Sequence, residues 1–220
     1  MAVAFFDLDK TLISRNSASL WIRSELRGGH ITRRIALRGM GYIVQYHLGM
    51  TQMEHALRYA VSILTGLREA DIVARTRAFY EAEVAQLYRP GAREAVERHR
   101  AAGDRLVLCT TSSSYLSEAV CAELDLETAL CNRFEVDDDG RYTGRAFEPL
   151  CFGPGKVALA QRWLVQNGER LEDAVFYSDS TSDLPMLEAV AHPVVVNPDV
   201  RLRRVARRRG WSLEDWGEPT

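Results

Sequence analysis

Apolar and polar residues follow two different spacings along the chain. A short apolar run that ends at Phe6 predicts a buried strand at the start of the sequence. From about Ser17 to about Tyr88 the apolar residues have helical spacing. Glycines divide this second stretch into several helices, at Gly28, Gly29, Gly49 and Gly66. The first part of the chain therefore predicts one strand followed by a block of helices.

From Pro90 onwards, predicted strands and helices alternate. The pattern predicts helices over 92–101, 115–124 and 156–166, a hairpin over 133–145, strands over 105–109, 174–177 and 194–196, and a helix that begins at Pro185. Alternation of this kind is typical of a parallel sheet in an α/β fold. We therefore predict an α/β core made of residues 1–14 and 89–220, with residues 15–88 inserted after the first strand as an all-helical cap.

Composition limits the class of protein. The chain has 220 residues, of which 46% are hydrophobic, and this is sufficient for a sizeable core. The net charge of −2 argues neither for nor against a polyanionic partner. The four cysteines are widely spaced without a C-x-x-C pair, which favours free thiols in a reducing compartment. No secretion signal precedes the first strand, so we predict a cytoplasmic protein.

The stretch that most resembles a membrane span covers residues 35–50. Arg38, Gln45 and His47 interrupt it, and it is shorter than a span requires. We therefore expect a buried helix over these residues and no association with a membrane.

Acids and hydroxyl groups follow three of the predicted strands. Asp7 and Asp9 come after the first strand, the run Thr110–Ser114 follows the strand over 105–109, and the run Ser178–Asp183 follows the strand over 174–177. In open α/β sheets, sites form beyond the carboxyl ends of the strands. A pair of adjacent carboxylates is tolerable where a divalent cation neutralises it, and Mg²⁺ prefers hard oxygen ligands.

Each of these features also has a simpler interpretation. Asp7 and Asp9 alone could form a solvated turn, and the serine run could be a helix N-cap. Asp179 and Asp183 could be acids that favour the start of a helix, and Lys156 could be a solvated lysine in a first helical turn. The features gain weight because they occur together and in order on an α/β frame.

In that combination the chain resembles the haloacid dehalogenase (HAD) superfamily. The four motifs of that superfamily match Asp7-Leu8-Asp9-Lys10-Thr11, Thr110, Lys156, and Asp179 with Asp183. The run 177–187, followed by His192-Pro193, is similar to the subfamily that contains phosphoserine phosphatases. The resemblance implies a Rossmann-like, three-layer parallel-sheet core with a helical cap, and a cytoplasmic phosphatase.

The resemblance also implies a role for each motif residue. Asp7 is then the nucleophile that forms an aspartyl-phosphate, and Asp9 is the general acid and base. Lys156 stabilises charge, while Thr110 and the backbone N–H of Thr111 hold the phosphoryl oxygens. The implied cofactor is Mg²⁺, with the carboxylates of Asp7 and Asp179 and the backbone carbonyl of Asp9 as ligands. Asp183 acts in the outer shell of the metal, orienting water or Lys156.

The implied substrate is a small phosphorylated metabolite. Phosphoserine phosphatases carry a glutamate about nine residues after the nucleophile, where it meets the substrate amine, and this chain has Asn16 there. We therefore expect Asn16 to contact a different amino-alcohol phosphate, such as histidinol phosphate, with phosphoserine as the alternative. Two interpretations of another class are a receiver domain that is phosphorylated as a switch, and a scaffold without catalysis. Receivers are shorter and lack the insert, and the intact acids argue against a scaffold.

Two groups of arginines have open roles. Seven arginines stand between residues 15 and 60, where they could steer an anionic substrate or form a solvated face. The run Arg201–Arg209 predicts the end of a terminal helix, where cations are favourable. We do not expect nucleic acid to be a partner.

Overall fold

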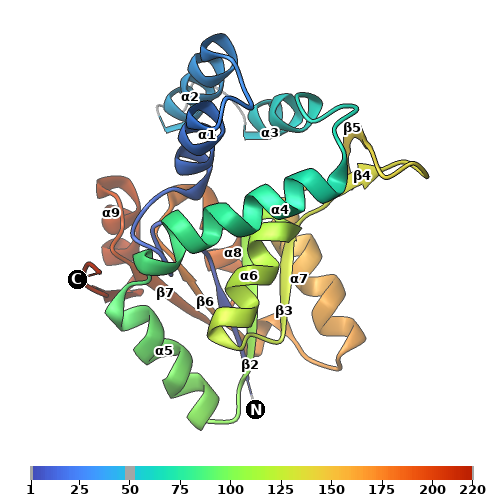
Figure 1. Cartoon of the computed structure of the whole chain (residues 1–220). Coiled ribbons are helices and arrows are strands. Elements are labelled where there is room, and N and C mark those ends of the chain that lie inside the picture. Colours follow the sequence, from blue (N-terminus) through green and yellow to red (C-terminus); the bar gives the residue numbers. More distant parts are fainter. Residues whose placement is uncertain (1, 48–52, 220) are drawn as a thin grey trace.

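Six parallel strands form the central sheet, in the order β3-β2-β1-β6-β7-β8 (Figure 1). The structure is a computed structural model and describes residues 2–47 and 53–219. The strands of the sheet are β1 (Val3–Phe6), β2 (Arg105–Ser113), β3 (Thr128–Asn132), β6 (Val175–Ser178), β7 (His192–Val196) and β8 (Ser212–Glu214). The first strand lies inside the sheet, between β2 and β6, so the residues that follow it emerge near the middle of the carboxyl edge.

Helices cover both faces of the sheet, because alternate side chains of β1 point to opposite sides. Phe6 lies in one buried cluster with residues of α5 (Pro90–Ala101) and α6 (Ser114–Leu124). Phe5 lies in a second cluster, which contains residues from three other helices. These are α7 (Pro154–Gln166), α8 (Leu184–Ala189) and α9 (Val200–Arg209). The predicted three-layer α/β fold is therefore confirmed.

In the described residues, four α-helices lie between β1 and α5 in the chain: α1 (Ser17–Arg27), α2 (Arg33–His47), α3 (Met53–Ser62) and α4 (Glu69–Phe79). The first three stand above the carboxyl ends of the strands (Figure 1). The chain after α4 continues as a π-helical turn (Tyr80–Val84) and a 3₁₀ turn (Ala85–Leu87). Phe79 and Val84 belong to the buried cluster on the sheet, so the last part of the insert packs on the core. The exact division into a core and a cap over 15–88 stays a prediction.

An antiparallel hairpin attaches the insert to the core from a second side. It consists of β4 (Phe134–Val136) and β5 (Tyr142–Ala146), as the sequence predicts. The Tyr142 carbonyl accepts a hydrogen bond from the Gly66 N–H at 2.9 Å, and the Tyr142 N–H donates to the Leu67 carbonyl at 3.0 Å. The Glu69 N–H donates to the Gly140 carbonyl at 2.9 Å. These backbone bonds hold the segment between α3 and α4 against the hairpin.

Several predicted elements differ from the observed ones. Strand β2 continues through Ser113, so Thr110 and Thr111 lie within its last residues rather than after it. The short strand β3 was not predicted, and β7 is not the last strand because β8 follows it. Strands of three to five residues without turn signals on both sides give little periodicity to detect.

The prediction of a buried helix over 35–50 is wrong for the described residues. The helix α2 ends at His47, and residues 48–50 lie outside the part of the chain that the structure describes. Within α2, Leu37 is 74% exposed and Val44 is 54% exposed, because the helix packs on its neighbours along one side only. No helix in the described ranges is long and apolar enough to cross a membrane. The cytoplasmic location stays a prediction.

The two-sided core makes a test of stability possible. Phe5 is fully buried and its ring meets Trp163 edge to face, with 6.1 Å between ring centroids. We expect Phe5→Ala to lower the free energy of unfolding by about 3–5 kcal/mol, measured by urea denaturation. The matched control is Phe147→Ala, at a side chain that is 57% exposed. Equal effects of the two substitutions would contradict the packing described here.

Candidate active site

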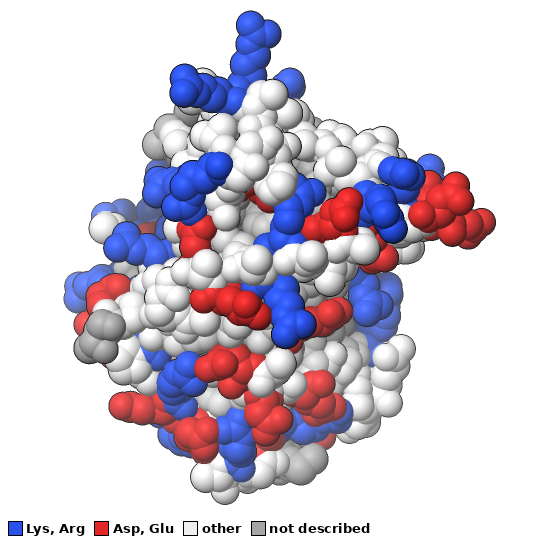
Figure 2. Space-filling view, in the orientation of Figure 1, with Lys and Arg blue, Asp and Glu red and all other residues white. Residues whose placement is uncertain are grey.

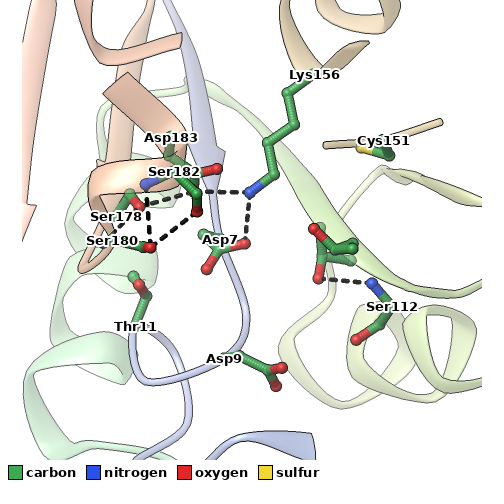
Figure 3. A network of polar contacts seen from close by, with 12 residues as sticks. Asp7, Asp9, Thr11, Ser112, Cys151, Lys156, Ser178, Ser180, Ser182 and Asp183 are labelled. Atoms are coloured by element: carbon green, nitrogen blue, oxygen red, sulfur yellow. Dashed lines mark hydrogen bonds and ion pairs between the residues drawn. The ribbon is translucent and has the colours of Figure 1, made fainter. Parts of the chain in front are cut away.

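A buried lysine joins two carboxylates at the carboxyl edge of the sheet (Figure 3). The Nζ atom of Lys156 lies 2.7 Å from Oδ1 of Asp7 and 2.8 Å from Oδ2 of Asp183. Ser178 donates from Oγ to the same Oδ2 of Asp183 at 2.7 Å. Lys156 is 1% exposed, Asp7 7% and Asp183 2%, so the single positive charge of the lysine faces two acids away from bulk water.

The loop before α7 determines where Lys156 lies. A Cβ atom on Gly155 would stand 1.9 Å from the carbonyl oxygen of Leu150, so only glycine fits beside that backbone. Gly153 has a positive φ of 49°, and Pro154 starts the helix, where a missing N–H costs nothing. Lys156 is therefore presented by the first turn of α7, with its side chain directed to Asp7.

Asp9 is bonded to the start of α1. Its Oδ1 accepts a hydrogen bond from the Ser17 N–H at 2.8 Å, and its Oδ2 accepts one from Nδ2 of Asn16 at 2.9 Å. Asn16 is also the N-cap of α1, because its Oδ1 accepts from the Ser19 N–H at 2.9 Å. Both polar atoms of the Asn16 amide thus have partners within the chain.

The turn after β1 also connects to the end of β6. Lys10 has a positive φ of 61°, and this left-handed residue allows the chain to reverse towards Ile13. The hydroxyl of Thr11 accepts a hydrogen bond from the Asp179 N–H at 3.0 Å. Two segments far apart in the sequence are therefore joined beside the two acids.

Polar groups at the end of β2 complete the arrangement. Oγ1 of Thr110 accepts from the Ser112 N–H at 3.2 Å, and the Ser112 hydroxyl lies 3.2 Å from that of Ser17. Asn132 bridges two segments, because its Nδ2 donates to the Thr111 carbonyl at 2.6 Å and its Oδ1 accepts from the Cys151 N–H at 2.8 Å. This amide ties the hydroxyl run to the loop that carries Lys156.

Burial raises the pKa of three acids of the site, Asp7, Asp9 and Asp179. It raises the pKa of Asp7 from 3.8 to about 7, against the opposing effect of Lys156. It raises the pKa of Asp9, although hydrogen bonds from Ser17 act in the other direction. The pKa of Asp179 lies well above its ordinary value through burial and the neighbouring charge of Asp7. Burial lowers the pKa of Lys156, but the charges of Asp183 and Asp7 outweigh it and raise that pKa well above its ordinary value.

All the predicted site residues line one cavity of about 260 Å³ between the cap and the sheet. They are Asp7, Asp9, Asn16, Thr110, Thr111, Lys156, Asp179 and Asp183. The structure therefore brings the predicted residues together, and their individual catalytic roles stay predictions. The cavity also opens onto α1, α2 and α3, which supply the opposite wall.

Some residues of the site gave no sequence signal. Asn132 stands at the end of the unpredicted strand β3, and its bridging role depends on contacts across the sheet. Glu25 is 6% exposed on α1 and accepts a hydrogen bond from Nη1 of Arg75 on α4 at 2.7 Å. Both pairings join segments distant in sequence. By contrast, Thr11 belongs to the first motif, and Ser178 directly precedes Asp179 of the last one.

The arginines of the insert lie on its outer surface. All seven between residues 15 and 60 are exposed, and Arg58 forms ion pairs with Glu54 and Glu148. Figure 2 shows basic side chains gathered over the top of the molecule, whereas both signs mix over the lower part. A steering role for these arginines stays a prediction. The second basic run lies in α9, which Asp199 caps and Gly210 ends, as the sequence predicts for a helix.

Comparison with known proteins agrees with this geometry. The family model of the haloacid dehalogenase-like hydrolases matches residues 4–188. A histidinol-phosphatase of Neisseria meningitidis serogroup C (strain 8013) is 28% identical over 215 residues, which cover 96% of this chain and 97% of the relative. Phosphoserine phosphatase SerB1 of Mycobacterium tuberculosis (strain ATCC 25618 / H37Rv) is 32% identical over 219 residues, which cover 98% of this chain and 71% of the relative.

A solved structure has the same fold over its whole length. It is a protein with unknown function from Bordetella pertussis Tohama I, with a TM-score of 0.89 and 31% identity, and the match covers 98% of each chain. The matched region of the family model contains every predicted catalytic residue. The chain is thus related over nearly its full length to phosphatases, and it belongs to the haloacid dehalogenase-like hydrolases.

Proposed function

We propose that the protein is a Mg²⁺-dependent phosphomonoester hydrolase that works through a phosphorylated Asp7. The observation that carries the proposal is the buried contact of Asp7 with Lys156, at 2.7 Å, in the cavity that also contains Asp9 and Asp179. A nucleophile for a phosphoryl group needs nearby positive charge, because the phosphoryl group is itself anionic. Lys156 supplies part of that charge from within the chain.

The names of the relatives support a small phosphorylated metabolite as the substrate. The neisserial relative is called a histidinol-phosphatase, which supports an amino-alcohol phosphate such as histidinol phosphate. The mycobacterial relative supports phosphoserine as the alternative. The Asn16 amide, which stands at the place of the glutamate in phosphoserine phosphatases, is already bonded to Asp9 and Ser19. An uncharged amide cannot pair with the substrate amine as a glutamate does, and this weakens the case for phosphoserine.

The residues present fit a Mg²⁺ ion. Asp7 and Asp179 are both buried carboxylates, and the charge of Asp7 raises the pKa of Asp179, so a divalent cation would relieve this repulsion. Within residues 2–47 and 53–219, no three His, Cys, Asp or Glu side chains form a metal cluster. Besides Asp7 and Asp179, the ligands of the ion would therefore be the Asp9 carbonyl and water molecules. Mg²⁺ usually keeps several waters. When bound, the ion would neutralise the carboxylates and polarise the phosphoryl oxygens.

In the first step, a carboxylate oxygen of Asp7 attacks phosphorus and the bond from phosphorus to the ester oxygen breaks. Asp9 gives its proton to that ester oxygen, so the alcohol leaves in neutral form. A raised pKa suits Asp9 for this task, because the group keeps its proton until the alcohol needs it. The hydroxyl of Thr110 and the N–H of Thr111 hold the phosphoryl oxygens.

In the second step, the Asp9 carboxylate accepts a proton from water as the water attacks phosphorus. The bond between phosphorus and Asp7 breaks, and inorganic phosphate leaves. Lys156 stays beside Asp7 throughout, held by Asp183 at 2.8 Å, so the charge on the returning carboxylate is matched at once. Asp183 acts in this scheme by positioning Lys156.

The nucleophile can be tested by Asp7→Asn. We expect the rate of p-nitrophenyl phosphate hydrolysis to fall by about 10³-fold or more, because an amide cannot form the phosphorylated intermediate. Acid quenching of the wild type with labelled substrate should trap phosphate on the protein, and the variant should trap none. The matched control is Asp139→Asn, at an exposed residue of the hairpin. Undiminished turnover in a folded Asp7→Asn protein would falsify the mechanism.

The metal can be tested at Asp179. We expect a chelator to abolish hydrolysis and added Mg²⁺ to restore it, and Asp179→Asn to raise the Mg²⁺ concentration for half-maximal rate by about tenfold or more. Asp173→Asn, at an exposed acid, serves as the control. Identical Mg²⁺ titrations for the two variants would show that Asp179 does not hold the ion.

The raised pKa of Asp7 predicts a pH dependence of stability in chelated protein. Because this pKa is about 7 in the folded chain and 3.8 ordinarily, the folded state binds more protons between these values. The contribution of Asp7 to stability is therefore fully present below its unfolded pKa and is lost as the pH rises through about 7. Melting temperatures from about pH 4 to about pH 8 should fall in the wild type relative to Asp7→Asn. A difference that is constant with pH would contradict the raised pKa.

A further inference from the structure

The active-site cavity has two ends of different chemistry. Charged side chains and hydroxyl groups surround the end at the sheet, where Asp7 and Lys156 lie. Large apolar side chains from the cap form the other end, which we call the apolar compartment. Its residues are Trp21, Ile22, Ile35, Leu57, Ile63 and Leu64.

The cap does not bury these apolar side chains in a core of its own. In the described parts of α1, α2 and α3, the fully buried apolar residues are Ala36 and Val61. The residues of the apolar compartment are only half-buried, and they face the cavity. Apolar surface in a concave wall beside catalytic groups favours a ligand with apolar surface of its own.

Contacts behind the wall fix the apolar compartment in place. The ring of Trp21 meets Phe79 edge to face, with 5.3 Å between ring centroids, and Phe79 belongs to the core cluster. The rings of Tyr42 and Tyr59, which line the cavity themselves, lie 5.2 Å apart, and the Arg38 guanidinium lies 4.5 Å from the Tyr59 ring. The compartment is therefore built by side chains that are themselves held, and the hairpin fixes the segment after α3.

The charge of this wall is already balanced. Among the described cap residues that line the cavity, Glu25 is the one charged side chain, and Arg75 pairs with it at 2.7 Å. An ammonium group in the apolar compartment would lose its hydration against Ile and Leu side chains, which is costly without a free anion. The wall is thus better matched to a hydrocarbon than to the amine of an amino alcohol.

The apolar compartment extends away from the reacting atoms along α1. The N–H of Ser17, the first residue of the helix, is bonded to Asp9, and Glu25 lies near the end of α1. The rise of an α-helix over these residues is about 12 Å. A group that begins at the ester oxygen beside Asp9 can therefore run along the helix beneath the cap.

We propose that the specific substrate is a phosphomonoester whose alcohol carries an apolar body, an alkyl chain or a hydrocarbon ring, that lies in the apolar compartment. This proposal rests on the proposed phosphatase function and names its class of substrate. The phosphate lies among Lys156, Thr110 and Thr111, and the apolar body contacts Trp21 and the isoleucine and leucine side chains of the cap. Phosphoserine and histidinol phosphate become competing outcomes of the test.

The test compares phosphate release from ethyl, butyl and hexyl phosphate with release from phosphoserine and histidinol phosphate, in the presence of Mg²⁺. We expect kcat/KM to rise about fourfold with each methylene, from the transfer of a methylene group out of water. Hexyl phosphate should exceed both amino-alcohol phosphates. Calorimetric titration with methyl- and hexylphosphonate, which the enzyme cannot hydrolyse at the C–P bond, should give the same order of affinity.

A pair of substitutions locates the effect. Leu57→Asn keeps the number and branching of the side-chain heavy atoms in the apolar compartment but replaces two methyl groups by an amide, and we expect it to lower the hexyl-to-ethyl ratio of kcat/KM by about tenfold. Leu37→Asn makes the same change on the outer surface of the cap, where the side chain is 74% exposed, and should leave the ratio unchanged.

The outcomes separate this proposal from the proposed function. If rates and affinities stay level or fall from ethyl to hexyl while hydrolysis still depends on Asp7, the proposal of an apolar substrate is wrong. The proposed phosphatase function then still holds. A preference for phosphoserine or histidinol phosphate over hexyl phosphate does the same. Failure to hydrolyse any of these esters, together with alkylphosphonate affinities that do not rise with chain length, overturns both.

Discussion

The placement of Lys156 between Asp7 and Asp183 is the constraint on which the rest of the site depends. A buried ammonium group needs an anion, and a buried pair of carboxylates needs a cation, so loss of the lysine would leave two buried anions and loss of either acid would leave the lysine with a single partner. Gly155 allows the close approach to the Leu150 backbone, and Pro154 starts α7. Together these two residues bring Lys156 to the acids. Catalysis and folding therefore share the same contacts.

The sheet makes this constraint possible. Its parallel strands end at one edge, so Asp7 after β1 and Asp183 after β6 meet although their positions in the chain are far apart. Thr11 and Asn132 add hydrogen bonds between neighbouring strand ends, and these bonds fix the loops against one another. The cap then closes the volume above, with a wall whose chemistry is independent of the catalytic end.

Much of this arrangement could be predicted from the sequence, because strand ends and helix starts have local signals. Asp7, Lys156 and Asp183 follow such signals, and the parallel topology implies that they converge. The role of Asn132 could not be predicted, because it depends on a short edge strand with little periodicity and on a partner across the sheet. The orientation of α2 was also misjudged, since an apolar run does not say whether a neighbour covers it.

The hydrogen bonds from Asn16 and Ser17 to Asp9 give the first helix of the cap a second role. Asp9, the proton donor of the proposed reaction, is held by the two residues at which the first helix of the cap begins. A rotation of α1 would either break these bonds or turn the Asp9 carboxyl away from the ester oxygen. The position of α1 and the orientation of the Asp9 carboxyl are therefore coupled. An ester that holds the cap in place would also align the acid that protonates its leaving group.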